Sequence, residues 1–121
     1  MKEFYRGDSV LLNYQILQDD GTPFNLTNWQ IRAELSDTQK QIRIKKASSN
    51  VQGGSENQIK IVNAINGEIQ VRIESSETQN LIPNTIYNFE IEITNLSQGL
   101  KYTVVRDQFM VLEDIIDWTN K

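Results

Sequence analysis

The side chains that most often perform catalysis or bind metals are missing from this sequence, which has no histidine and no cysteine. Zinc, iron–sulfur, haem and copper sites would therefore lack their usual ligands. Ser-His-Asp and Cys-His catalysis are excluded, and no imidazole can act as a general base near neutral pH. Any catalysis would have to use carboxylates, lysine or tyrosine.

Carboxylates gather in two places, Asp19-Asp20 and Glu113-Asp114 with Asp117. Paired carboxylates can hold calcium or hydrolyse glycosides. Their spacing here matches no calcium-binding loop, and Asp-rich tips are common in ordinary turns. We therefore predict a protein that is not an enzyme, with no catalytic residue, metal site or cofactor.

Three short motifs match known recognition sequences, but each also has a structural explanation. Arg6-Gly7-Asp8 matches the integrin-binding tripeptide, yet it leads directly into a predicted strand and is typical of a turn. Asn25-Leu26-Thr27 and Asn95-Leu96-Ser97 are glycosylation sequons, which we interpret as turn residues because no secretory signal precedes them.

The charge distribution argues against nucleic acid as a partner. The formal net charge is −4, and the basic residues cluster only at Lys40, Arg43, Lys45 and Lys46, with no aromatic residue among them. A nucleic-acid-binding face is usually basic with interleaved aromatics. No apolar run is long enough for a membrane span, and the first residues lack the apolar stretch of a signal peptide, so we expect synthesis in a cytoplasm and no membrane partner.

Apolar and polar residues alternate in many short segments, which is the pattern of half-buried β-strands. The segments are residues 9–17, 31–35, 42–44, 59–61, 69–73, 87–93 and 102–111. Asn66-Gly67 predicts a hairpin turn. In the last segment the alternation shifts, which predicts a bulge near Arg106-Asp107.

Two connections have distinct compositions. Residues 46–57 are polar, contain paired glycines and are the longest predicted loop. Residues 75–81 predict one helical turn with a serine as its N-cap, which Pro83 prevents from extending.

About seven strands with turns between them predict a β-sandwich or a small barrel, in one domain spanning residues 1–121 with a short tail from about residue 115. The alternation predicts that the core contains Tyr14, Ile31, Ala33, Leu35, Ile69, Val71, Phe89, Ile91, Val104 and Phe109.

The two tryptophans could stack on a sugar or a base. Trp29 shortly precedes a strand, and we predict that it belongs to the core. Trp118 lies in the tail, where core packing and partner contact are equally open. Because a dispensable tail seldom keeps apolar residues, Ile115, Ile116 and Trp118 are candidate partner contacts.

The order of these segments resembles that of the small immunoglobulin-like domain of tailed-phage virion proteins, found at the N-terminus of upper baseplate proteins and in stand-alone tail or fibre-associated proteins. In that family the first strand is followed by Gly-x-Pro-x-Asp-Leu-Thr-Gly, and here Gly21-Thr22-Pro23-Phe24-Asn25-Leu26-Thr27-Asn28 follows it. Further shared segments are Ile31–Leu35, Gly67–Val71, Ser76–Pro83, Tyr87–Ile93, Tyr102–Arg106 and Phe109–Val111. The similarity covers roughly residues 5 to 114.

The departures are physically mild. Asn28 and Asn84 stand where the family often has glycine, and asparagine is a good substitute for glycine at positive φ. Asn25 replaces an aspartate and keeps a short side chain that can bond the nearby backbone.

The resemblance implies an immunoglobulin-like antiparallel β-sandwich and a structural role in a virion, in its tail, baseplate, fibre, neck or capsid surface. It implies no catalytic residues. Its partners would be copies of itself and other virion proteins, in a ring-like or threefold homo-oligomer. A carbohydrate-binding or adhesion module that uses a tryptophan and the Asp-rich tip is the alternative.

Overall fold

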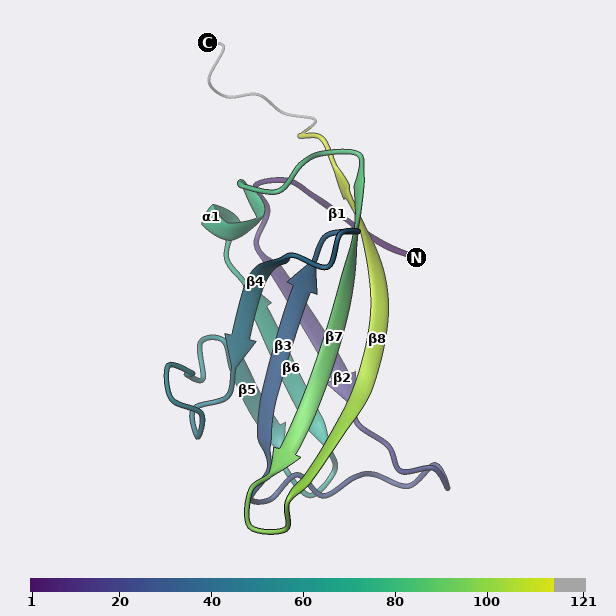
Figure 1. Cartoon of the computed structure of the whole chain (residues 1–121), viewed down its shortest axis with the longest axis vertical. Helices are drawn as coiled ribbons and strands as arrows, with labels where there is room; N and C mark the ends of the chain where they lie inside the picture. The colour runs from purple at the N-terminus through teal and green to yellow at the C-terminus, as the bar shows by residue number, and fades with distance from the viewer. Residues whose placement is uncertain (115–121) are drawn as a thin grey trace.

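A computed structural model describes residues 1–114. In these residues the chain forms eight β-strands and one helical turn, arranged as two sheets packed face to face (Figure 1). The predicted all-β sandwich is therefore confirmed. None of the described residues belongs to a helix long and apolar enough to cross a membrane.

The larger sheet has five strands and the smaller has three. In spatial order the larger sheet contains β1 (Lys2–Tyr5), β8 (Leu100–Leu112), β7 (Thr85–Asn95), β3 (Gln30–Ser36) and β4 (Ile42–Ala47). The smaller contains β2 (Val10–Gln15), β6 (Glu68–Ile73) and β5 (Ile59–Asn63). Neighbouring strands are antiparallel except β1, which runs parallel to β8.

The core lies between the sheets and follows from the alternation of apolar residues. In β7, for example, Phe89, Ile91 and Ile93 point inward and are almost fully buried, while Glu90 between them is exposed. The predicted core residues are buried with two exceptions, Tyr14 and Val104, which are only partly buried. Tyr14 lies on β2, the edge strand of the smaller sheet, and Val104 lies on the part of β8 that β1 does not pair with.

Two strand predictions need correction. The bulge in β8 lies around Val104, opposite Ile91 and Glu92, and not at Arg106-Asp107. Asp107 therefore pairs with Phe89 and lies on the inward-facing side of the sheet. The second correction is β1, which the sequence did not predict because only Phe4 of its four residues is buried.

The connection after β4 is shorter and better anchored than predicted. Lys46 and Ala47 belong to β4, and the connection spans residues 48–58. Ser48 and Val51 are buried, and the Gln58 side chain accepts a hydrogen bond from the Ala47 N–H at 2.9 Å. These contacts close the side of the sandwich between β4 and β5.

The predicted helical turn is present as α1 (Ser75–Thr78), but its N-cap is Glu74 and not a serine. Glu74 and Glu77 form a capping box in which the Glu77 carboxylate accepts the Glu74 N–H at 2.9 Å. The Glu77 N–H, which a serine hydroxyl at the N-cap would accept, donates to the Glu74 carbonyl at 2.9 Å, so no serine is needed there.

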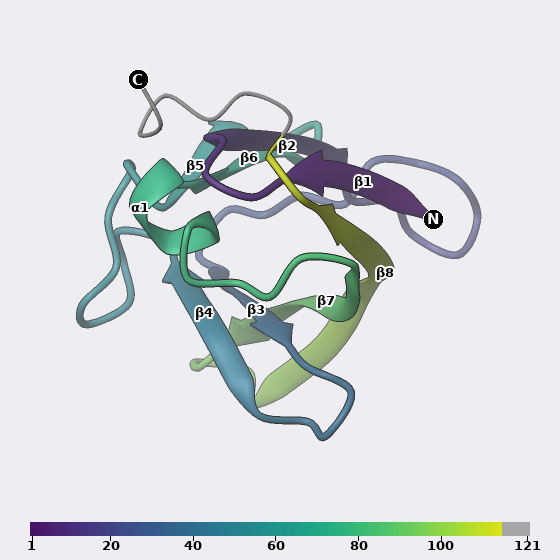
Figure 2. The ribbon, with the colours of Figure 1, turned by 90° about the horizontal axis from the view of Figure 1, so that it is seen from above.

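The sandwich has two unlike ends. We call the end that carries α1, the β1–β2 turn (residues 6–9) and the β3–β4 turn (residues 37–41) the helix end. The opposite end, formed by the connections 16–29, 64–67 and 96–99, is the loop end (Figure 1). Seen from the helix end, α1 lies over the opening between the two sheets (Figure 2).

Candidate functional site

The described residues contain three groups of side chains that could serve a function: a polar network at the helix end, a Lys-Tyr-Asp cluster between the edges of the two sheets, and an apolar surface at the loop end.

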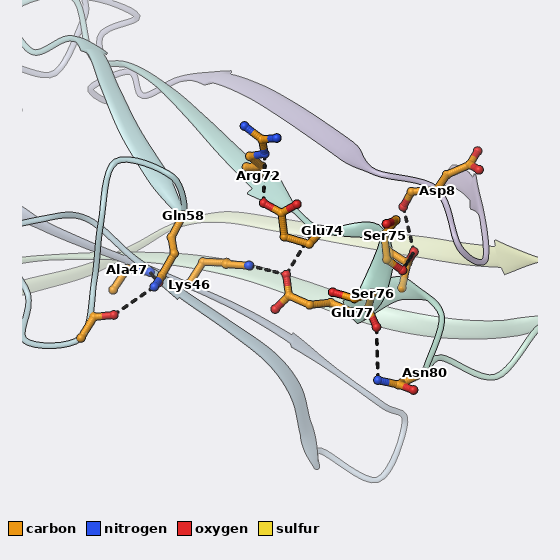
Figure 3. A network of polar contacts seen from close by, with 12 residues as sticks. Asp8, Lys46, Ala47, Gln58, Arg72, Glu74, Ser75, Ser76, Glu77 and Asn80 are labelled. Carbon is orange, nitrogen blue, oxygen red and sulfur yellow. Dashed lines mark hydrogen bonds and ion pairs between the residues drawn. The ribbon is translucent and has the colours of Figure 1, made fainter.

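The helix end is held by α1, which contacts three separate parts of the chain (Figure 3). The side chain of Lys46 lies inside the sandwich, only 7% exposed, and forms an ion pair with Glu77. Thr78 is fully buried, and its hydroxyl accepts the Gly7 N–H at 3.0 Å and donates to the Asp8 carbonyl at 2.8 Å. A further ion pair joins Glu74 to Arg72 of β6 at 3.0 Å. The network therefore ties α1 to both sheets and to the β1–β2 turn.

The Lys-Tyr-Asp cluster closes the side of the sandwich between β2 and β8. The Tyr14 hydroxyl donates to Asp107 Oδ2 at 2.9 Å, and Lys2 Nζ lies 3.0 Å from the same oxygen. Lys2 also lies over the Tyr14 ring, 4.7 Å from its centroid. One carboxylate thus joins β1, β2 and β8.

Electrostatics hold this cluster in one protonation state near neutral pH. Burial raises the pKa of Tyr14, and the bond to the Asp107 carboxylate and the charge of Asp107 raise it further. Partial burial acts to raise the pKa of Asp107, but hydrogen bonds from Lys2 and Tyr14 and the charge of Lys2 outweigh it, so this pKa is lowered. A tyrosine that keeps its proton and a carboxylate that stays ionised suit a structural contact, because neither exchanges a proton readily near pH 7.

The loop end is built around three aromatic rings. Trp29 packs edge-on against Phe24 with centroids 5.0 Å apart and stacks on Tyr102 at 5.8 Å. Trp29 is only 7% exposed, as predicted for a core residue, whereas Tyr102 is 45% exposed. The loop end therefore presents apolar surface supported by a rigid aromatic base.

The outer face of the larger sheet carries an open hollow of about 760 Å³ lined mostly by polar side chains. Glu34 and Glu90 stand directly opposite each other on β3 and β7, and Arg106 binds Glu90 at 3.1 Å. Among residues 1–114, no group of three or more potential metal ligands is found.

The recognition motifs are engaged in local structure. Arg6-Gly7-Asp8 forms the turn between β1 and β2, where a Cβ added to Gly7 would lie 2.7 Å from Gln79 Oε1. Asn25 Oδ1 accepts the Thr27 N–H at 3.0 Å, and buried Asn95 accepts the Gln98 N–H at 3.1 Å. The asparagines of both sequons thus serve as turn formers.

The basic residues that are close in sequence do not form one face. Lys46 points into the sandwich toward Glu77, and Arg43 is paired with Asp37 at 2.8 Å. Lys40 lies in the β3–β4 turn with φ of 66°.

The remaining sequence candidates cannot be placed in full. Asp20 of the Asp19-Asp20 pair accepts the Thr22 N–H at 2.9 Å within its own turn. Asp114 lies beside Gly7, while Asp117 and the predicted partner contacts Ile115, Ile116 and Trp118 lie outside the described residues.

None of the three groups above was predicted from the sequence. Lys46 lies two residues after buried Ile44 in β4, and this two-residue spacing indicates that its side chain points to the same inner face. The Lys-Tyr-Asp cluster had no such signal, because its members are far apart in sequence and meet only when β1 pairs with β8.

No family model matches the chain, and a search of curated proteins found no match.

Proposed function

We propose that this protein is an immunoglobulin-like module of a tailed-phage virion. Made in the host cytoplasm, it would act without catalysis, by binding copies of itself and neighbouring proteins of the tail, baseplate, fibre, neck or capsid surface.

The observation that carries this proposal is the conformation of the three asparagines at which the sequence differs from the phage pattern. Asn28 has φ of 68° and Asn84 has φ of 60°, the left-handed conformation that glycine adopts most easily. At the remaining departure, Asn25 accepts the Thr27 backbone N–H as an aspartate would. At all three positions the chain therefore has a conformation or contact that the family's usual residue could also adopt, which supports the proposal.

The connectivity supports the immunoglobulin-like part of the proposal. The smaller sheet has the order β2-β6-β5, and β8-β7-β3-β4 faces it in the larger sheet. These orders correspond to strands B, E and D packed on strands G, F, C and C′ of an immunoglobulin sandwich. A tryptophan directly before β3 also lies close to the place of the core tryptophan on strand C.

A single tyrosine adds a second, independent argument. Tyr87 lies near the start of β7, and its hydroxyl accepts the Ile82 backbone N–H at 2.9 Å. A tyrosine at the start of strand F that bonds the backbone a few residues upstream is the tyrosine corner of these sandwiches.

The carbohydrate-binding alternative depends on an exposed tryptophan, and one of its two candidate tryptophans is buried. Its first requirement was an accessible tryptophan, and the Trp29 ring is buried between Phe24 and Tyr102. Of the two tryptophans, only Trp118 could still stack on a sugar, which makes this function the weaker of the two.

The direct test is to detect the protein in purified phage particles by mass spectrometry and to locate it with labelled antibody by electron microscopy. Glycan-array binding of the same preparation serves as the comparison. We expect the protein in particles at a fixed ratio to the other structural proteins, and no glycan binding. Its absence from every particle, together with no binding to the products of neighbouring genes, would overturn the proposal.

A further inference from the structure

The loop end exposes more apolar surface than a free turn region requires. Leu96 is 71% exposed and Ile65 is 70% exposed, each at the tip of a hairpin turn. Leu17 and Leu100 are also exposed at this end, and the exposed Tyr102 ring stacks on the buried Trp29 ring. Exposed apolar surface that is backed by packed aromatic rings is typical of a site for another protein.

The loop end is also almost free of charge. In its three connections only Asp19 and Asp20 are charged, and both lie at one turn. The connections at the helix end instead carry Arg6, Asp8, Asp37, Lys40, Glu74 and Glu77. Charged residues are depleted at the centres of protein interfaces, so the loop end is the better candidate surface.

The chain itself contains a segment of matching chemistry, Ile115-Ile116-Asp117-Trp118, with three apolar side chains and one charge. It follows Asp114, which lies at the helix end beside Gly7. Strand β8 has 13 residues and separates Asp114 from the loop end by roughly 40 Å at ~3.3 Å per residue. Trp118 is four residues beyond Asp114 and reaches at most about 14 Å at ~3.6 Å per residue, so this segment cannot reach the loop end of its own chain.

We infer that the loop end binds the Ile115–Trp118 segment of a second copy of this chain, so that copies associate head to tail. The inference rests on the proposed assembly function and names the contact through which the assembly forms. Because the two contacting surfaces differ and lie at opposite ends of the molecule, the contact is heterologous. Repeated in one direction, such contacts close into rings or continue as chains.

The test uses two full-length variants that each disable one surface. Ile65→Asp with Leu96→Asp places charges on the loop end, at side chains too exposed to matter for folding. Ile116→Asp with Trp118→Asp does the same to the tail segment. Ile82→Asp is the matched control, because Ile82 is 63% exposed at the helix end. Far-UV circular dichroism verifies that all variants are folded.

Sedimentation velocity and light scattering then report self-association. We expect each double variant to lose self-association by about tenfold or more in the association constant, as for central interface residues, and the control to match the wild type. The decisive measurement mixes the two double variants. One keeps the tail and the other keeps the loop end, so the mixture should form dimers with one copy of each and nothing larger.

Other results overturn the inference in distinguishable ways. If the wild type associates but the loop-end variant does so equally well, or if the mixture forms no dimer, the contact lies elsewhere and the assembly proposal stands. If the wild type stays monomeric alone, head-to-tail association is wrong, and detection in particles decides the proposed function separately.

Discussion

The helix end and the loop end close the same sandwich by different means. At the helix end a buried lysine, a buried threonine and two glutamates bind one another and the backbone around α1. At the loop end three aromatic rings pack together, and the turns are completed by backbone and asparagine hydrogen bonds. Polar contacts of this kind define one geometry but leave few apolar side chains for a partner. Aromatic packing stabilises the fold and leaves apolar surface outside, which is why we assign the docking role to the loop end.

The largest effect should come from removing the aromatic support of the loop end. Trp29→Ala should lower the free energy of unfolding by about 3–5 kcal/mol, because buried area is lost and a cavity remains. Urea unfolding followed by circular dichroism measures this, with Trp29→Phe as a milder control. A loss below about 0.5 kcal/mol, typical of surface changes, would show that the rings do not support this end.

At the helix end the two partners of the ion pair should respond unequally. Glu77→Ala removes an acceptor of Lys46 and the capping bond to Glu74, and it should cost about 2 kcal/mol. Lys46→Met should cost less, because Met fills similar space and Glu77 remains partly exposed to water. Urea unfolding of both variants checks the order, and a greater loss for Lys46→Met would contradict it.

The Lys-Tyr-Asp cluster lies between the two ends and should make the stability of the fold depend on pH. Because the folded pKa of Tyr14 lies above its unfolded value of about 10, its contribution is fully present below that value. This contribution is lost as the pH rises further. Tyr14→Phe should cost about 1 kcal/mol at neutral pH and weaken the loss of stability above about pH 10. Unfolding midpoints of both proteins across this range measure the effect, and parallel pH profiles would contradict it.

The smallest effect concerns an asparagine with positive φ, which occurs at both ends of the sandwich. Asn28 at the loop end and Asn84 after α1 both have positive φ. Replacement by Gly should change stability by no more than about 0.5 kcal/mol, whereas Ala should cost about 1 kcal/mol because its Cβ crowds this conformation. Thermal unfolding of the four variants tests this. Equal stability of the Ala and Gly variants at either position would show that the backbone relaxes there.

The sequence predicted most of the fold where a strand alternates cleanly and much less at its edges. Phe89 and Ile91 could be placed in the core because each is flanked by polar residues. Strand β1 could not be predicted, since three of its four residues are exposed and its partner is the last strand of the chain. The bulge was expected two residues too late, because alternation shows that the parity changes but not which residue is left unpaired.

The candidate sites follow the same rule. Burial of Trp29 was predicted from its position before a strand, and positive φ at Asn28 and Asn84 was suggested by the glycines that the resembling family has there. The contact of Tyr14 with Asp107 was not, because it depends on the distance between two strand edges in different sheets. The apolar character of the loop end was also missed, since its residues come from three connections that only the fold brings together.

The pairing of β1 with β8 has a consequence for how the protein is made. Among the strands described here, β1 is synthesised first and pairs with β8, which is synthesised last, and Lys2 bonds Asp107 across a separation of 105 residues. β1 therefore has no partner until the end of β8 has been synthesised, and such long-range pairing slows folding. During translation β1 stays unpaired, and Lys2 and Phe4 can reach Asp107 and Phe109 only after β8 has been made.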